Sequence, residues 1–278
     1  MKQFVKGVLN RLAPQWTAAR MSERARAHSH RVVASWGCDS INRRLLEAFG
    51  NTVQEGPFAG LILTPMTHAE QIGPFLLGVY ESELDRAWEV VFRGAYTRIV
   101  DVGAKFGYYA VGLAKRFPHA AVVAYDTDRW ARKAVLEMVA ANGTANVEVE
   151  GFCTPDRLAR IDSGAAFIIS DCEGYESALF GPETLPHLRT ATLIIETHDC
   201  FVPGVADRLR KAFAGTHVVR EYGLDDVRRK SSRSLEFLTE AERPLAEREV
   251  RPAQLWLLCL PRTGPNESLG RGHPEVVS

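Results

Sequence analysis

Two acidic motifs in the sequence combine residue types that can transfer protons or bind a cation. One is DCEGYE, which begins at Asp171 and contains Glu173, and the other is ETHD, which contains Glu196 and His198. Each follows a short apolar run, where carboxylates are unfavourable unless they bind a cation, hold a ligand or take up a proton. Imidazole has an ordinary pKa near neutrality. We therefore expect all four side chains to converge over one cleft, with His198 as a base.

These motifs also allow other interpretations. Asp171 can orient a ligand or hold a divalent cation such as Mg²⁺, whereas Glu176 and Asp199 fit solvated loop charges. A zinc site formed by Cys172, His198 and Cys200 would need a fourth ligand, and a nucleophilic Cys172 would be expected at a helix N-terminus. The five cysteines include no C-x-x-C pair, which favours reduced thiols.

A glycine-containing loop, DVGAKFGYY, follows another apolar run and precedes a helical pattern. Gly103 allows a tight turn and Gly107 a close approach, so we expect a larger side chain at Gly103 to block a ligand without unfolding the protein. A dinucleotide loop would have glycine where Lys105 and Tyr108 stand, so the spacing suits a smaller ligand. Asp126 lies 23 residues beyond Gly103, where a carboxylate can accept hydrogen bonds from both hydroxyls of a ribose. The alternative role of Asp126 is to cap a helix.

Short β-branched runs alternate with amphipathic helical stretches from residue 98 onwards. This alternation predicts right-handed crossovers and an α/β fold with a Rossmann-like, doubly wound parallel sheet. Ligands in such sheets bind beyond the carboxyl ends of the strands, where the motifs above lie. We expect strands at 99–102, 121–125, 147–149, 167–170, 193–196, 217–220 and 255–260, and helices at 109–116, 129–142, 155–161 and 205–213.

The composition changes along the 278 residues and predicts a division into segments. We expect a basic, mostly helical N-terminal extension at 1–55, a strand-and-helix lead-in at 56–97, the sheet domain at 98–262 with a charged insertion at 223–250, and a flexible tail at 263–278.

The charge balance limits the classes of partner. The 34 Lys and Arg residues equal the 34 Asp and Glu residues, so no nucleic-acid partner is expected. The first 31 residues nevertheless hold seven basic residues and one acidic residue, which allows a peripheral membrane or protein contact; the alternative is a solvated helix that packs on its own domain. Since no apolar run approaches a membrane span or a signal-peptide core, we expect a cytoplasmic protein.

Several motifs, taken in order along the chain, resemble the FkbM family of class I S-adenosylmethionine-dependent methyltransferases. They are GPFAGL from Gly56, LLGVYESEL ending at Leu84, VDVGAKFGYYA, DCEGYE, LIIETHD and FAGTH, which together span roughly residues 55–222. The resemblance implies a seven-stranded sheet of order 3-2-1-4-5-7-6 with the last strand antiparallel.

The resemblance also implies a cofactor, S-adenosylmethionine, and a role for each loop. Residues 103–108 would line its methionine portion, Asp126 its ribose, and residues 152–154, which begin with Phe152, its adenine. Lys105 stands where such proteins often have Asn, and Thr127 where Pro is common. The implied cofactor contacts are Asp101, Gly103, Ala104, Lys105, Phe106, Gly107, Tyr108, Asp126, Thr127, Cys153, Thr154 and Asp171.

The activity implied by the resemblance is O-methylation of a small-molecule acceptor, a hydroxyl on a sugar or a secondary metabolite such as a polyketide. The acceptor oxygen would attack the sulfonium methyl in line while a base removes the hydroxyl proton. Two alternatives share the sheet: a nucleotide-binding oxidoreductase, which the missing third glycine disfavours, and a non-catalytic domain that binds a partner through the basic arm.

Overall fold

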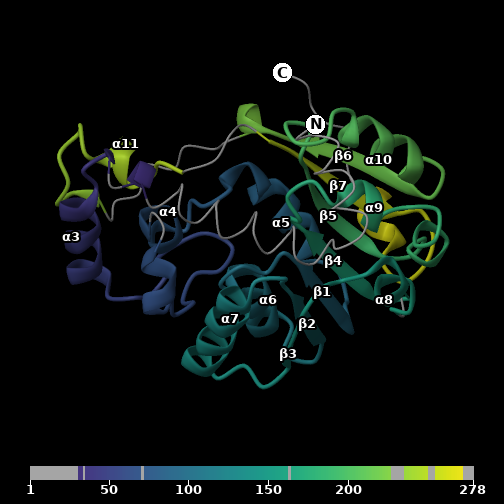
Figure 1. Ribbon diagram of the computed structural model, residues 1–278, viewed down its shortest axis with the longest axis horizontal. Helices are drawn as coiled ribbons and strands as arrows, with labels where there is room; N and C mark the ends of the chain where they lie inside the picture. Colours follow the sequence, from purple (N-terminus) through teal and green to yellow (C-terminus); the bar gives the residue numbers. More distant parts are fainter. Residues whose placement is uncertain are drawn as a thin grey trace, which may run out of the picture.

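The computed structural model describes residues 31–33, 35–69, 72–161, 164–226, 235–249 and 254–271. Within these residues, seven strands form one mixed sheet (Figure 1). The order across the sheet is β3-β2-β1-β4-β5-β7-β6. Only β7 runs antiparallel to its neighbours, β5 and β6, among these seven strands. The predicted fold class and strand order are therefore confirmed. The strands are β1 (Arg98–Val102), β2 (Ala121–Tyr125), β3 (Val147–Glu150), β4 (Ala166–Ser170), β5 (Thr192–Thr197), β6 (His217–Tyr222) and β7 (Leu255–Pro261).

Helices cover both faces of the sheet, so its central strands are apolar on both sides. Along β1, Ile99 packs in the apolar layer on one face, whereas Val100 and Val102 pack in the layer on the other, as expected for side chains that alternate along a strand. The first face is covered by α5 (Asp85–Val91), α6 (Tyr108–Arg116) and α7 (Arg129–Asn142), and the second by α8 (Pro155–Ala159), α9 (Glu176–Leu179) and α10 (Val205–Phe213) (Figure 1).

Local signals in the sequence set the ends of the longest helix. The Asp128 carboxylate accepts a hydrogen bond from the Trp130 N–H and caps α7, and Gly143, with φ of 64°, ends it. Both are the expected chemistry for a helix start and stop. The predicted bounds of α7 and α10 agree with the structure, whereas α8 ends at Ala159 rather than at residue 161.

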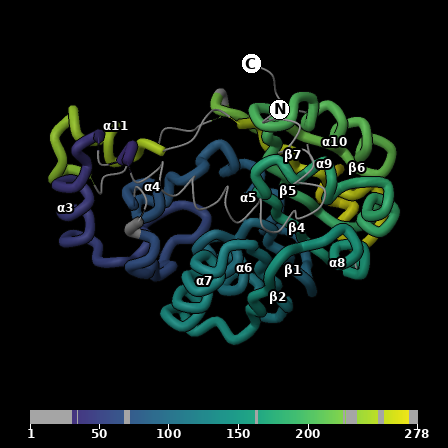
Figure 2. The backbone as a smooth tube through the Cα atoms, in the orientation of Figure 1, coloured from purple at the N-terminus to yellow at the C-terminus, as the bar shows by residue number. Residues whose placement is uncertain are grey.

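The segments before β1 and before β7 pack together beside the sheet. Figure 2 shows α3 (Asp39–Phe49), α4 (Ile72–Leu77) and α11 (Arg243–Ala246) side by side. An ion pair joins Arg44 to Glu242, and the Arg248 guanidinium lies 4.0 Å from the centre of the Trp36 ring. The charged stretch before β7 is thus, where described, a structured part of this region. Residues 1–30 lie outside the described residues, and membrane contact through the basic arm stays a prediction.

The lead-in before β1 is helical where it was predicted to contain a strand. Within residues 56–69 and 72–97, its regular elements are η1 (Pro65–Ala69), α4, η2 (Ser82–Leu84) and α5. Its only β pairing in that part is an isolated bridge between Thr52 and Ile62. None of the described helices is both long and apolar enough to cross a bilayer.

The prediction of a flexible tail from residue 263 is wrong as far as Arg271. The short helix η6 (Glu267–Arg271) packs on β7. Just before it, Asn266 is buried, and its side-chain amide accepts from the Ala95 N–H at 3.0 Å and donates to the Ala95 carbonyl at 3.2 Å. This pairing anchors the segment although its composition is typical of a loop. Residues 272–278 lie outside the described residues.

A buried histidine at the start of β6 should make the stability depend on pH. Burial lowers the pKa of His217 to about 4. Its Nε2 forms a hydrogen bond with the Ala191 carbonyl at 3.0 Å. The unfolded chain, with an ordinary value near 6.5, therefore binds a proton that the native state excludes. Between pH 7.5 and pH 5 this residue should remove about 2 kcal/mol from the free energy of unfolding. Urea titrations of the wild type and His217→Gln at both pH values test this, since only the wild type should show that part of the loss.

Candidate active site

The loops that follow four strands meet at one edge of the sheet. Val102 at the end of β1 pairs with Tyr125 on β2 and with Ser170 on β4, and Ser170 pairs in turn with Ile195 on β5. Because these strands are parallel, the glycine loop, Asp126 and both acidic motifs extend beyond the same edge. This is the edge at which sheets of this kind bind ligands.

Backbone packing explains both glycines of the loop. A Cβ at Gly103, where φ is 93°, would lie 1.7 Å from the backbone oxygen of Asp171. A Cβ at Gly107, where φ is 88°, would lie 3.3 Å from Val135 of α7. The loop is also tied to the neighbouring strand, because the N–H groups of Gly103 and Ala104 both donate to the Tyr125 carbonyl. The expectation that a larger side chain at Gly103 would leave the fold intact is therefore wrong, because the missing Cβ makes room for the loop after β4.

The aromatic side chains of the loop point into the protein. Phe106 and Tyr108 are buried, and their rings lie 4.9 and 5.2 Å from Phe75. Their contribution to a bound ligand is thus limited to their backbone. Lys105 has a φ of 51°. Burial and the charge of Asp171 raise the pKa of Glu173 to about 7 against the opposing charges of His198 and Lys105, so Lys105 and Glu173 lie within electrostatic reach of each other.

Asp126 organises the loop at the end of β2. Its Oδ2 accepts the Lys105 N–H and its Oδ1 accepts the Asp128 N–H, both at 2.8 Å. A carboxylate offers about four acceptor sites, enough to serve ribose hydroxyls beside such backbone donors. The hydrogen bond from the Lys105 N–H also connects Asp126 directly to the glycine loop.

The residues expected near adenine lie at the end of β3. Thr154 caps α8 by accepting the Arg157 N–H at 3.2 Å, and the Phe152 ring lies 5.0 Å from that of Tyr175. Burial raises the pKa of the Cys153 thiol to about 12, so this thiol is unreactive at neutral pH. Thr127 is half-buried in the loop beside Asp126.

A buried carboxyl group lies under the glycine loop. Asp101 is 3% exposed, and its Oδ2 has no hydrogen-bond partner in the described part of the chain. Burial, together with the charges of Asp171 and Asp126, raises its pKa to about 8, although a backbone hydrogen bond at Ala110 opposes this shift. A cationic group beside Asp101 would offset the negative charge shared by the carboxyl groups of Asp101, Asp126 and Asp171.

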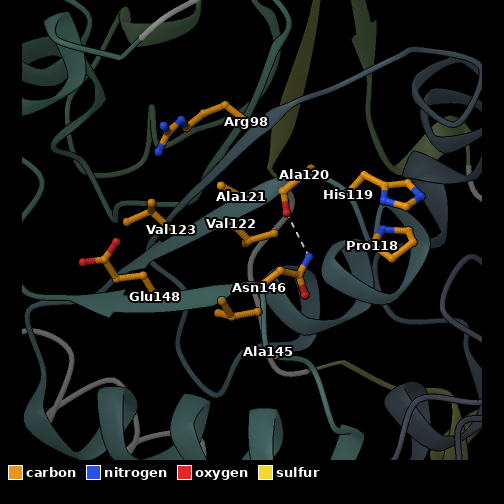
Figure 3. A pocket seen from close by; sticks show the side chains of 11 residues that line it. Arg98, Pro118, His119, Ala120, Ala121, Val122, Val123, Ala145, Asn146 and Glu148 are labelled. Atoms are coloured by element: carbon orange, nitrogen blue, oxygen red, sulfur yellow. Dashed lines mark hydrogen bonds between the residues drawn. The ribbon is translucent and has the colours of Figure 1, made fainter.

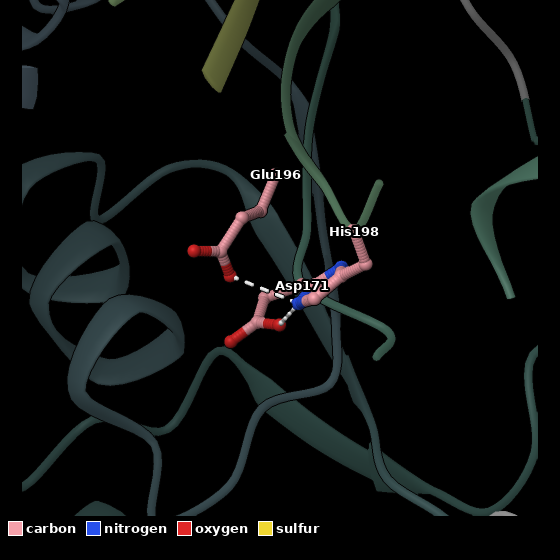
Figure 4. Close-up of side chains that lie close together, drawn as sticks. All are labelled: Asp171, Glu196 and His198. Atoms are coloured by element: carbon pink, nitrogen blue, oxygen red, sulfur yellow. Dashed lines mark ion pairs between the residues drawn. The ribbon is translucent and has the colours of Figure 1, made fainter. Parts of the chain in front are cut away.

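The two acidic motifs meet around one buried imidazole (Figure 4). His198 Nε2 lies 3.4 Å from Asp171 Oδ1, 3.4 Å from Glu196 Oε2 and 3.7 Å from Glu173 Oε2. His198 and Glu196 are buried, whereas the side chain of Asp171 is 27% exposed. The four side chains that the sequence predicted to converge do lie together.

The interpretation of Glu176 as a solvated loop charge is wrong. This residue begins α9, is fully buried, and places Oε1 2.5 Å from His198 Nδ1. The same oxygen accepts the Gly174 N–H at 3.1 Å. The available signal was the apolar pair that follows, Leu179 and Phe180, which is buried together with the acid at the start of α9. Asp199, in contrast, accepts backbone N–H groups at the start of α10.

The carboxylates change the protonation of His198. Burial lowers its pKa, but this is outweighed by the hydrogen bond to Glu176 and by the charges of Asp171, Glu176 and Glu173, which together raise the pKa to about 9. In this arrangement the imidazole is protonated at neutral pH. The expectation of a neutral base relied on the ordinary value near 6.5 and does not hold for this state of the site.

The cysteines do not join this group. Among the described residues, the set of side chains placed to share a metal ion is Asp171, Glu196 and His198, without a thiol. Burial raises the pKa of Cys172 well above its ordinary value, and Cys200 is exposed on the surface. The interpretations of Cys172 and Cys200 as zinc ligands and of Cys172 as a nucleophile therefore lose their support.

A shallow pocket of about 390 Å³ lies at the opposite edge of the sheet (Figure 3). Its lining includes Arg98, Ala121 and Val147, which begin β1, β2 and β3, and Asn146, whose amide donates to the Ala120 carbonyl at 2.9 Å. It faces the amino ends of the strands and is separate from the candidate site.

No protein-family model matches the chain, and no curated protein matches it. Solved structures with a similar fold include the O-methyltransferase TomG from Streptomyces achromogenes in complex with SAM, with 14% identity over 72% of this chain and 91% of that chain and a TM-score of 0.46. A rRNA methylase from Streptococcus thermophilus has 13% identity over 64% and 95% of the two chains and a TM-score of 0.43. Precorrin-6y C5,15-methyltransferase from Geobacter metallireducens has 11% identity over 63% and 85%, with a TM-score of 0.41. Similarity at this level concerns the fold alone.

Proposed function

We propose that this protein is an S-adenosylmethionine-dependent methyltransferase of the FkbM type that methylates a hydroxyl group. The observation that carries this proposal is the sheet order, with an antiparallel β7 between β5 and β6. It is the order that the resemblance of the sequence motifs implied. A dinucleotide-binding sheet has the order 3-2-1-4-5-6 instead, which disfavours the oxidoreductase alternative.

The side chains at the carboxyl edge fit this cofactor. S-adenosylmethionine, when bound, supplies a methyl group on a positively charged sulfur, and it carries a cationic amino group and a ribose. Asp126 would hold the ribose hydroxyls, and the buried Asp101 carboxyl would face the amino group, which supplies the hydrogen bond that its Oδ2 lacks. Asp171 and Glu173 add negative charge on the side where β4 ends.

The cluster around His198 would lie on the acceptor side. Asp171, Glu173 and His198 would position an acceptor hydroxyl, and its proton would pass to a cluster carboxylate. As the hydroxyl oxygen bonds to the methyl carbon, the methyl–sulfur bond would break and its electron pair would stay on sulfur, leaving S-adenosylhomocysteine. Holding the two reactants in line supplies much of the rate enhancement. Beside the cluster, the half-exposed Phe201 ring stacks on His198 with a centroid distance of 5.7 Å, which offers an apolar surface to a sugar ring or a polyketide acceptor.

The cofactor assignment can be tested at Asp126. Asp126→Ala should weaken S-adenosylmethionine binding by about 100-fold, because two hydrogen bonds to a charged group together contribute about 3 kcal/mol. Asp128→Ala is the matched control, since it removes a neighbouring carboxylate that caps α7 and should leave affinity unchanged. Isothermal calorimetry on both variants, with melting curves to check folding, gives the comparison. Equal affinity in both variants, or tighter binding of NAD than of S-adenosylmethionine by the wild type, would contradict the proposal.

A further inference from the structure

We propose that Asp171, Glu196 and His198 form a binding site for one divalent transition-metal ion, for which Mn²⁺ is the appropriate probe. One ligand atom from each residue lies within 4.8 Å of the others. In Figure 4 the three side chains, from the ends of two neighbouring strands, point toward one another.

The spacing of these atoms is that of metal ligands. Metal–ligand bonds to imidazole and carboxylate are about 2.0–2.2 Å long, so adjacent ligands in tetrahedral or octahedral arrangements lie about 3.0–3.5 Å apart. His198 Nε2 lies 3.4 Å from an oxygen of Asp171 and 3.4 Å from an oxygen of Glu196. These separations are long for hydrogen bonds and match two ligand–ligand edges of a coordination shell.

The burial and hydrogen bonding of His198 support a metal site independently of the spacing of the ligand atoms. His198 is fully buried, and within the described residues its Nε2 has no hydrogen-bond partner although it faces the carboxylates. Its other nitrogen, Nδ1, is bonded to the buried Glu176. Once an ion displaces the Nε2 proton, a histidine that donates its Nδ1–H to a carboxylate presents the lone pair of Nε2, which is the arrangement typical of metal-binding histidines.

The charge of the site favours a cation. Four carboxylates, those of Asp171, Glu173, Glu176 and Glu196, surround a single imidazole. A divalent ion would compensate two of these charges and displace a proton from His198. Glu173, at 3.7 Å from Nε2, lies close enough to reach such an ion through a water molecule.

The donor set selects the class of ion. Mg²⁺ and Ca²⁺ prefer oxygen ligands, whereas imidazole suits transition metals. One imidazole with two carboxylates therefore fits Mn²⁺, Fe²⁺ or Zn²⁺ better than the Mg²⁺ suggested by the acidic motifs alone. If the proposed function holds, an ion here would bind the acceptor hydroxyl and lower its pKa; this role rests on that function, and the binding of the ion does not.

Direct binding tests the inference without an acceptor. The untagged full chain, treated with EDTA and dialysed, would be titrated with Mn²⁺ while electron paramagnetic resonance reports the free ion. We expect one tightly bound Mn²⁺ per chain, at least tenfold weaker binding in His198→Gln, Glu196→Gln and Asp171→Asn, and tenfold or more weaker binding of Mg²⁺ to the wild type. His187→Gln and Glu183→Gln are matched controls at exposed positions and should bind as the wild type does.

The variants also separate this inference from the proposed function. Asp171 is partly exposed, so Asp171→Asn serves where a substitution in the buried pair prevents folding. Absence of a stoichiometric Mn²⁺ site, or undiminished binding in folded Asp171→Asn, would overturn the metal site. S-adenosylmethionine binding measured on the same samples reports separately on the function: Mn²⁺ uptake without cofactor binding contradicts only the methyltransferase proposal, and the reverse contradicts only the metal site.

Discussion

Gly103→Ala is expected to lower the free energy of unfolding by about 3 kcal/mol or more, because it combines a strained backbone with a steric overlap. The added Cβ would lie 1.7 Å from the carbonyl oxygen of Asp171, and the residue has a φ of 93°. Backbone occupies the space on that side, so no rotation of a side chain can relieve the overlap. Urea unfolding followed by circular dichroism measures the loss.

Gly143→Ala is the control for the backbone strain alone. Gly143 has a φ of 64°, and a Cβ there would meet nothing within 4 Å, so its substitution should cost about 1 kcal/mol. If the two variants lose the same stability, the close approach between the loops after β1 and β4 does not exist in solution.

Glu176→Ala should also be strongly destabilising, with a loss of about 3–5 kcal/mol in the free energy of unfolding, since it breaks a fully buried pair and leaves His198 without its Nδ1 partner. Glu173→Ala is the matched control, because the Glu173 side chain is 52% exposed and lies 3.7 Å from His198. Glu173→Ala should therefore cost below about 1 kcal/mol. The measurement is again urea unfolding, and similar small losses for both variants would show that Glu176 is not buried against His198.

The regular part of the fold could be predicted because its signals are local. The strands from β1 to β6 are short runs that contain β-branched residues, and α7 carries its own start and stop signals in Asp128 and Gly143. The antiparallel placement of β7 has no such local signal, since Leu255–Pro261 reads as an apolar strand in either direction. That part of the topology came from the resemblance of the motifs.

The parts that could not be predicted depend on contacts between distant segments. The role of Gly103 is set by a carbonyl 68 residues later in the chain, at Asp171. Asn266 is held by Ala95, 171 residues away, and the burial of Glu176 follows from the packing of α9 against α10. In the candidate site, the sequence therefore identified the residues that converge. It missed Glu176, the acid that orients His198, and it missed the raised pKa of His198 that the surrounding carboxylates cause.

The central claim is that the carboxyl edge of the sheet binds S-adenosylmethionine with its methyl group toward the His198 cluster. A crystal structure of the protein grown with S-adenosylmethionine tests it most directly. We predict that the ribose hydroxyls contact the Asp126 carboxylate, that the amino group lies on the Asp101 side, and that the sulfur lies between the glycine loop and Asp171. Cofactor bound elsewhere, such as in the pocket at the amino edge beside Asn146, or no cofactor at a saturating concentration, would contradict the account.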